Sequence, residues 1–243
     1  MSINGINDIA ELLSANSYPG RGIIIGQSKD GKNAMIAYFI MGRSANSRNR
    51  IFERFDGGMR TKAFDESKLE DPSLIIYNPY LKSANGTMDI ITNGDQTDTV
   101  LNALAEGKTF EEGLRTREFE PDHPNYTPRI SGINYYCFPR NTFVYKLSIL
   151  KSSNGNPEVC NRYFYEYAPI AGLGHFIHTY ECDGDPIPSF YGEPEMVELP
   201  NTAEELADVV WNNLNEDNKV SLFVRCVPLD GSQPSEIIIN KNN

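Results

Sequence analysis

The sequence predicts an α+β protein whose β-sheets are mainly antiparallel. Segments rich in β-branched and aromatic residues recur between Gly, Pro, Asn and Asp turn signals, which is typical of strands joined as hairpins. The few segments with helical periodicity do not alternate regularly with strands, as they would in a parallel βαβ fold. Hydrophobic residues make up 40% of the 243-residue chain, which is enough for a packed core.

The N-terminal residues are expected to form a helical extension of one single domain. Residues 1–17 place Ile6, Ile9 and Leu13 on one side at helical spacing. Residues 18–243 contain no repeat, low-complexity tract or long linker that would divide them. We therefore expect a helical extension at 1–17 and a single domain at 18–243.

The elements of the domain follow from local signals. An Asp-Gly turn at 30–31 separates two apolar runs and predicts a hairpin. Thr109 with Glu112 and Thr202 with Glu205 match capping boxes, which indicate helix starts. Strands are expected at 22–26, 34–41, 73–77, 88–92, 129–136, 143–151, 159–167, 175–180, 220–227 and 237–239, helices at 97–105, from 109 and from 202, and a loop at 119–128.

Charge and hydropathy exclude several classes of function. The formal net charge is −11, which makes nucleic acid and anionic membranes poor partners. No run approaches the roughly 18 apolar residues of a membrane helix, and the N-terminus lacks the pattern of a signal peptide. The four cysteines are widely spaced and form no CxxC, so reduced thiols are expected. A cytoplasmic location is therefore predicted.

One basic segment stands out in this acidic chain. From Gly31 to Phe52 there is no Asp or Glu, while Lys32, Arg43, Arg48 and Arg50 lie in the same window. The segment is either a local anion site or a solvated basic face.

Standard catalytic and metal-binding signatures are absent from the sequence. There is no Walker A loop, no GxGxxG after a strand and no GxSxG elbow. His175-x-x-His178 with Cys182 could suggest zinc, but residues three apart on a strand point to opposite faces. Neither a metal nor a cofactor is therefore expected.

Five short strings, in order and at approximately the same spacing, carry a resemblance to a known family. They are Tyr18-Pro19-Gly20-Arg21 before an apolar strand, Arg43-Ser44-x-x-x-Arg48, Tyr77-Asn78 with Asn93-Gly94-x-x-Thr97-Asp98, Glu120-x-Asp122 before Thr127-Pro128-Arg129-Ile130, and Thr202-Ala203-Glu204-Glu205-x-Ala207-Asp208. Together they resemble the archaeal-type IMP cyclohydrolase family.

The resemblance implies a fold, a reaction and partners. The fold is a four-layer αββα sandwich like that of N-terminal-nucleophile hydrolases. The reaction closes FAICAR (5-formamidoimidazole-4-carboxamide ribonucleotide) to IMP with loss of water, the final step of de novo purine synthesis. The partner is this small purine ribonucleotide, and a separate enzyme must supply the formyl group. A homo-oligomer is left open.

The chain also departs from the family pattern. Residues 1–17 look like an extension, and Ala45-Asn46-Ser47 replaces an aromatic-Pro-Asn stretch. Gln96 and Pro121 stand where the archaeal proteins carry His and Lys. These departures leave room for a related but altered substrate.

The resemblance and the chemistry together select candidate residues. Tyr77 could donate to the formyl oxygen, Glu120 could orient or deprotonate the carboxamide, and Arg43 could contact the phosphate or developing oxyanion. Tyr77, Glu120 and Arg43 are thus the catalytic candidates. The substrate-binding candidates are Arg21, Ser44, Arg48, Asn78, Asn93, Gly94, Asp98 and Arg129.

Each candidate has a plainer interpretation. Arg43 and Arg48 could be solvated, Tyr77 could be a core strand residue, and Glu120 could be a solvated loop acid. Asn93-Gly94 precedes a helix that Asp95 or Thr97 could cap, and Arg129 could be a salt-bridge partner.

Two further classes of function remain open at this stage. One is a non-catalytic or altered-substrate relative that binds purine nucleotides with the same fold. The other is an amide hydrolase that uses Ser2 as an N-terminal nucleophile, although Ser2 lies in the extension.

Overall fold

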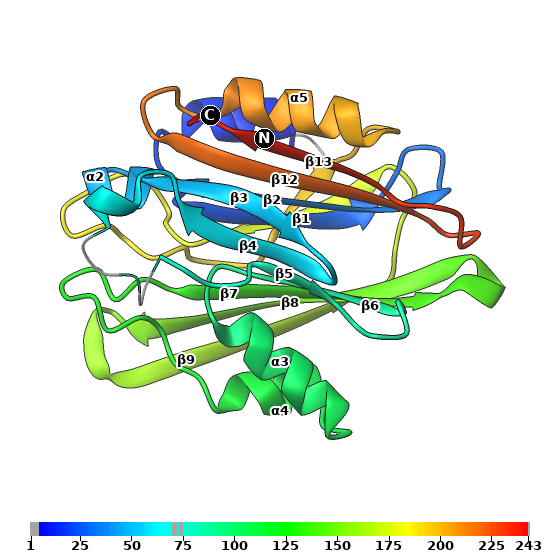
Figure 1. Cartoon of the computed structure of the whole chain (residues 1–243), viewed down its shortest axis with the longest axis horizontal. Helices are drawn as coiled ribbons and strands as arrows, with labels where there is room; N and C mark the ends of the chain where they lie inside the picture. The colour runs from blue at the N-terminus through cyan, green and yellow to red at the C-terminus, as the bar shows by residue number, and fades with distance from the viewer. Residues whose placement is uncertain (1–4, 70–71, 73–74, 243) are drawn as a thin grey trace.

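Two antiparallel β-sheets form the body of the protein (Figure 1). The structure is a computed structural model that describes residues 5–69, 72 and 75–242. The six-stranded sheet has the order β11 (Glu195–Glu198), β10 (Leu173–His178), β1 (Arg21–Gln27), β2 (Asn33–Met41), β12 (Lys219–Pro228) and β13 (Ser235–Asn240). The seven-stranded sheet has the order β3 (Arg50–Phe55), β4 (Gly58–Ala63), β5 (Tyr80–Lys82), β6 (Met88–Thr92), β7 (Arg129–Cys137), β8 (Thr142–Ser153) and β9 (Asn156–Tyr167). The predicted α+β class with mainly antiparallel sheets is confirmed.

Helices lie on the outer faces of the two sheets (Figure 1). The α-helices of the described residues are α1 (Ile9–Ala15), α2 (Ala45–Arg48), α3 (Gln96–Ala105), α4 (Phe110–Arg115) and α5 (Ala203–Asn213). Apolar side chains of α1 and α5 pack on the six-stranded sheet, and those of α3 and α4 pack on the seven-stranded sheet. None of the helices that the structure describes is long and apolar enough to cross a membrane.

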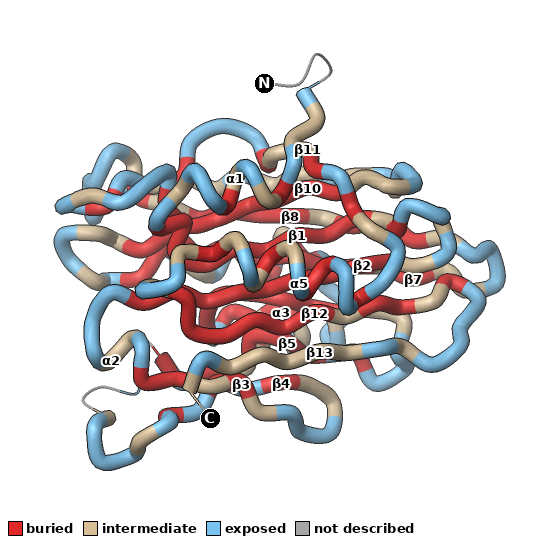
Figure 2. The backbone as a smooth tube through the Cα atoms, turned by 90° about the horizontal axis from the view of Figure 1, so that it is seen from above, coloured by how far each residue is buried: buried red, intermediate tan, exposed pale blue. Residues whose placement is uncertain are grey.

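The largest apolar cluster contains residues from both sheets. Along β2, Ile36, Tyr38 and Ile40 belong to this cluster, whereas Met35 and Phe39 belong to the cluster under α1 and α5. Because alternate residues of a strand face opposite sides, β2 is buried on both faces. This explains its long apolar run, and Figure 2 shows the central strands of this sheet buried.

Most predicted elements are confirmed, and the helix starts are the clearest cases. Both capping boxes are formed, at Thr109 with Glu112 and at Thr202 with Glu205. The hairpin of β1 and β2 is confirmed, and so is the irregular segment at 119–128. The helix expected at 1–17 is shorter in the structure and spans Ile9–Ala15, and residues 1–4 lie outside the described residues.

The predicted strand at 73–77 is wrong in its described part. Ile75, Ile76 and Tyr77 are not in a strand, and residues 73–74 lie outside the described residues. Among the described residues the backbone of Tyr77 bonds only to Thr61, through the Thr61 amide at 2.9 Å and the Thr61 hydroxyl at 2.9 and 3.1 Å. A contact with one residue does not extend into a ladder of strand pairs. Helix α2 and strands β3, β4, β5 and β11 were not predicted.

Candidate active site

Several strand ends and one loop meet at one end of the two sheets. Strand β1 begins there with Arg21, β3 with Arg50 and β7 with Arg129. The loop at 119–128 leads into β7 and carries Glu120. These four side chains are buried and form a charge cluster, because the charges of all three arginines act on Glu120.

The arginines of the charge cluster have unused hydrogen-bond donors. Arg50 is completely buried, and its Nε donates to the carbonyl of Ser47 at 2.8 Å. Both of its terminal nitrogens lack a partner among the described residues, as do the Nε atoms of Arg21 and Arg129. Buried charged donors without acceptors are unfavourable in a finished protein interior. The arrangement therefore favours an anionic ligand.

Burial and like charge act together on Arg50. Burial lowers the pKa of the Arg50 guanidinium, and the positive charge of Arg21 lowers it further. Burial also opposes the charged form of Arg21, but Tyr18, Tyr180 and Glu120 outweigh it and raise its pKa. Two buried arginines close enough to repel each other are stabilised when an anion lies between them.

Glu120 is a buried carboxyl group that titrates near neutral pH. Burial raises the pKa of Glu120 to about 7, although the charges of Arg21 and Arg129 oppose the shift. The interpretation of Glu120 as a solvated loop acid is therefore wrong, since the residue is only 4% exposed. A carboxyl group that titrates near pH 7 can both accept and return a proton.

Two tyrosine hydroxyls lie beside the arginines. The hydroxyls of Tyr38 and Tyr77 are 2.8 Å apart and hydrogen bonded. Tyr77 is on an irregular segment rather than a strand, and its charge coupling to Arg21 and Arg50 places it near both. Burial raises the pKa of Tyr38 well above its ordinary value, so Tyr38 stays protonated and can donate to Tyr77.

The loop that carries Glu120 is held in place by a tyrosine. The Tyr180 hydroxyl is 2.6 Å from the hydroxyl of Thr127, and its ring stacks on Tyr18 with centroids 5.8 Å apart. The amide of Glu120 donates to the carbonyl of Thr127 at 2.9 Å. The position of Glu120 therefore depends on Thr127 and Tyr180.

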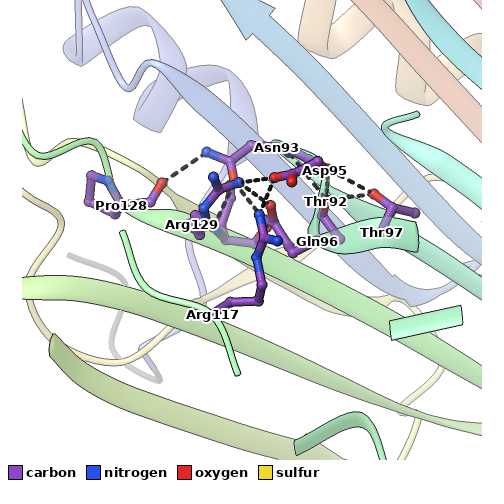
Figure 3. Close-up of polar contacts among 10 residues, drawn as sticks. Thr92, Asn93, Asp95, Gln96, Thr97, Arg117, Pro128 and Arg129 are labelled. Atoms are coloured by element: carbon purple, nitrogen blue, oxygen red, sulfur yellow. Dashed lines mark hydrogen bonds and ion pairs between the residues drawn. The ribbon is translucent and has the colours of Figure 1, made fainter. Parts of the chain in front are cut away.

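Asn93 and Gln96 connect the end of β6 to the start of β7 (Figure 3). The Asn93 Oδ1 accepts from the Ile130 amide at 2.9 Å and from Gln96 Nε2 at 3.0 Å, while its Nδ2 donates to Pro128 at 2.8 Å. All three of these hydrogen bonds of the Asn93 side chain are thus made to other residues of the protein. Asn93 positions the start of β7, where Arg129 lies.

Arg129 is oriented by the same group of residues (Figure 3). Its Nη1 donates to Asp95 at 2.8 Å and to Gln96 Oε1 at 2.7 Å. A Cβ atom on Gly94 would lie 2.3 Å from that nitrogen, so glycine allows Arg129 its close approach. Asp95, one of the two residues proposed to cap α3, is at its N-cap position, but its carboxylate makes no cap bond and instead binds Arg117 and Arg129. The hydroxyl of Thr97, the other candidate, donates to the Gly94 carbonyl at 3.1 Å.

Arg43, Ser44 and Arg48 make contacts outside the charge cluster. Arg43 pairs with Asp183 at 2.6 Å, and its guanidinium lies 5.2 Å from the centre of the Tyr18 ring. Ser44 caps the short helix α2. Arg48 donates to the Gly42 carbonyl at 2.8 Å and to Asn218 at 3.1 Å.

Asn78 and Asp98 contact each other, with the Asn78 amide donating to the Asp98 carboxylate at 3.2 Å. The roles predicted for these residues and for Arg43, Ser44 and Arg48 stay predictions. The predicted site residues did not include Arg50, Tyr38 or Tyr180. The only sequence signal for Arg50 was its place in the acid-free window from Gly31 to Phe52, where Arg43 and Arg48 also lie.

The two histidines of the suspected zinc motif face opposite sides of β10. The Nδ1 of His175 lies 2.7 Å from the Tyr145 hydroxyl, and its ring stacks on Tyr167. His178 contacts the Tyr180 carbonyl at 2.8 Å and Glu195 at 3.4 Å. No group of three metal-ligating side chains occurs among residues 5–69, 72 and 75–242.

Comparison with known proteins gives one family assignment. Residues 18–231 match the family model described as IMP cyclohydrolase-like protein. No curated protein matches the chain. The family match covers well over half of the 243 residues and includes every member of the charge cluster. The chain therefore belongs to the IMP cyclohydrolase-like family.

Proposed function

We propose that the protein closes FAICAR to IMP with loss of water, as the final step of de novo purine synthesis. The observation that carries the proposal is the buried Glu120, with a pKa of about 7, among arginines with free donors. Family membership supports a purine ribonucleotide as the substrate. No cofactor is needed, because the reaction forms one C–N bond and eliminates water.

Glu120 acts first as base and then as acid in this proposal. The carboxamide nitrogen attacks the formyl carbon, and its proton passes to Glu120 as the new C–N bond forms. The formyl oxygen takes up a proton from the Tyr77 hydroxyl and becomes a hydroxyl group. That hydroxyl then leaves as water when Glu120 returns the first proton. As it leaves, the formamido nitrogen gives up its N–H proton, which restores the Tyr77 hydroxyl, and the ring C=N bond forms. The pKa of about 7 suits both directions of transfer.

Tyr77 and the arginines stabilise negative charge. The hydroxyls of Tyr38 and Tyr77 share one hydrogen bond. With Tyr38 as its donor, the Tyr77 proton is free to hydrogen-bond the formyl oxygen as it gains charge. The free donors of Arg21 and Arg50 suit either that oxygen or the 5′-phosphate, for which guanidinium is a forked partner. Holding the two reacting groups in contact supplies much of the acceleration.

The fold proposed with this function is the four-layer αββα sandwich of N-terminal-nucleophile hydrolases. Its support is the shared apolar cluster of the two sheets and the helices packed on their outer faces. The proposal does not use an N-terminal nucleophile, since the chemistry is assigned to Glu120 and Tyr77. Ser2 lies outside the described residues.

Conversion of FAICAR by the purified chain, followed by the absorbance of IMP, tests the proposal. We expect Glu120→Gln to lower kcat by roughly 10²-fold, within the range for a general acid–base group. Glu118→Gln is the matched control, because Glu118 is two residues away but 66% exposed. A parent chain that binds IMP but does not convert FAICAR would instead be a non-catalytic or altered-substrate relative.

A further inference from the structure

A cavity of about 400 Å³ lies beside the loop that carries Glu120. It is bordered by this loop, by the end of β8, by the middle of β9 and by the segment before β11. None of its lining residues belongs to the charge cluster. Its volume is in the range of small-molecule sites. The lining side chains that bear on a ligand are Lys151, Asn125, Asn154, Asn161, Tyr163 and Tyr191.

Lys151 supplies a positive charge to this cavity. Its Nζ donates to the Phe190 carbonyl and lies 5.7 Å from the centre of the Tyr163 ring and 5.4 Å from that of Tyr191. Among the described residues no carboxylate forms an ion pair with it, whereas Lys146 on the same strand binds both Glu111 and Glu166. Two of its three ammonium donors therefore remain for a ligand.

The aromatic rings of the cavity are available for stacking. The Tyr191 side chain is 83% exposed, while its backbone amide is fixed by a hydrogen bond of 3.1 Å to Glu181. Tyr163 is 41% exposed and comes from β9. An exposed aromatic ring held by an anchored backbone presents a flat apolar surface at low entropic cost.

The amide side chains add donors and acceptors at the same cavity. Asn125 accepts from the Ile187 amide at 3.0 Å, which leaves its own NH₂ group for other partners. Asn154 and Asn161 line the cavity from the β8–β9 hairpin. Amide groups recognise the edges of purine and pyrimidine bases, because each offers a donor and an acceptor side by side.

We propose that this cavity is a second nucleotide-binding site, in which Lys151 binds the phosphate and Tyr163 or Tyr191 stacks on the base. A cation, two accessible rings and three amides match the phosphate, the π-face and the polar edge of a nucleoside monophosphate. The cavity has no lining residue in common with the charge cluster, and its occupation does not depend on the reaction proposed above.

Titration calorimetry of the full chain with AMP, and with adenosine as a probe without phosphate, tests the proposal. We expect AMP to bind, adenosine to bind at least tenfold more weakly, and Lys151→Gln to weaken AMP binding by at least tenfold. Tyr191→Ala should weaken it several-fold, and this exposed residue can be changed without disturbing the core. Lys146→Gln is the matched control and should leave AMP affinity unchanged.

Two results would overturn the proposal. One is AMP affinity equal to that of the parent in folded Lys151→Gln and Tyr191→Ala variants, or no AMP binding at millimolar concentration. The other is AMP binding that is lost in Arg50→Lys but kept in Lys151→Gln, which would place the nucleotide in the charge cluster. Turnover of FAICAR by Lys151→Gln should equal that of the parent, since Lys151 has no part in the proposed reaction.

Discussion

The carboxyl group of Glu120 should make the stability of the fold depend on pH in a way that Glu120→Gln abolishes. Burial raises the folded-state pKa of Glu120 to about 7 from an ordinary value of 4.5. Below pH 4.5 the group is protonated in both folded and unfolded chains. Between 4.5 and 7 only the unfolded chain ionises, so the free energy of unfolding falls. A pKa difference of about 2.5 corresponds to about 3 kcal/mol of stability lost by pH 8.

Urea unfolding followed by circular dichroism at pH 4.5, 6 and 8 measures this effect. All other titratable groups are the same in the parent and in Glu120→Gln, so the difference between the two free energies isolates Glu120. We expect the stability of the variant relative to the parent to increase by about 3 kcal/mol between pH 4.5 and 8. A difference that stays constant within about 1 kcal/mol would refute a buried, neutral-range Glu120.

Three further perturbations have defined outcomes. Tyr77→Phe should lower kcat for FAICAR by roughly 10²-fold with little change in IMP affinity, because it removes a donor used in the transition state. An unchanged kcat would exclude that role for Tyr77. Arg50→Lys should weaken IMP binding by roughly tenfold in calorimetry, whereas Arg54→Lys on the same strand should not, since Arg54 is exposed. Equal affinities of the two variants would contradict ligand contact at Arg50. Gly94→Ala should lower the free energy of unfolding, measured in urea, by about 1–3 kcal/mol, because the new Cβ displaces Arg129. A stability equal to that of the parent would show that Arg129 is free to move.

Elements marked by local signals could be predicted from the sequence. The capping box at Thr202 starts α5, and β6 has the predicted bounds Met88–Thr92. The hairpin of β3 and β4 was missed because its strands mix charged and apolar residues, as expected for a partly exposed strand at a sheet edge. Ile75 and Ile76 resemble a buried strand in composition, yet in the described part of this segment the contacts with β4 go through Thr61 alone and form no strand ladder. Strand pairing depends on residues far apart in the chain, so local composition does not predict it.

The candidate site was predictable where the family pattern pointed to a residue, which includes Arg21 and Arg129 of the charge cluster. Glu120 and Tyr77 were identified, although the burial that raises the pKa of Glu120 depends on the packing of distant segments. Tyr180 lies 53 positions from Thr127 along the chain, yet their hydroxyls are hydrogen bonded. No local sequence pattern predicts a hydrogen bond between residues so far apart in the chain. The residues that hold the loop in place are therefore visible only in the folded structure.

Arg50 shows that the position of a residue on a strand decides its burial, even where the sequence does not distinguish it from its neighbours. Arg43, Arg48 and Arg50 all lie in the acid-free window, and nothing in composition distinguishes them. On β3, however, Arg50 is two residues before Phe52, which packs in the apolar cluster of the two sheets. Residues two apart on a strand share a face, so Arg50 must point inward as well. The two terminal nitrogens of this buried guanidinium have no acceptor among the described residues, so an anion beside them would stabilise its charge. This is the physical reason to expect the nucleotide at this end of the sheets.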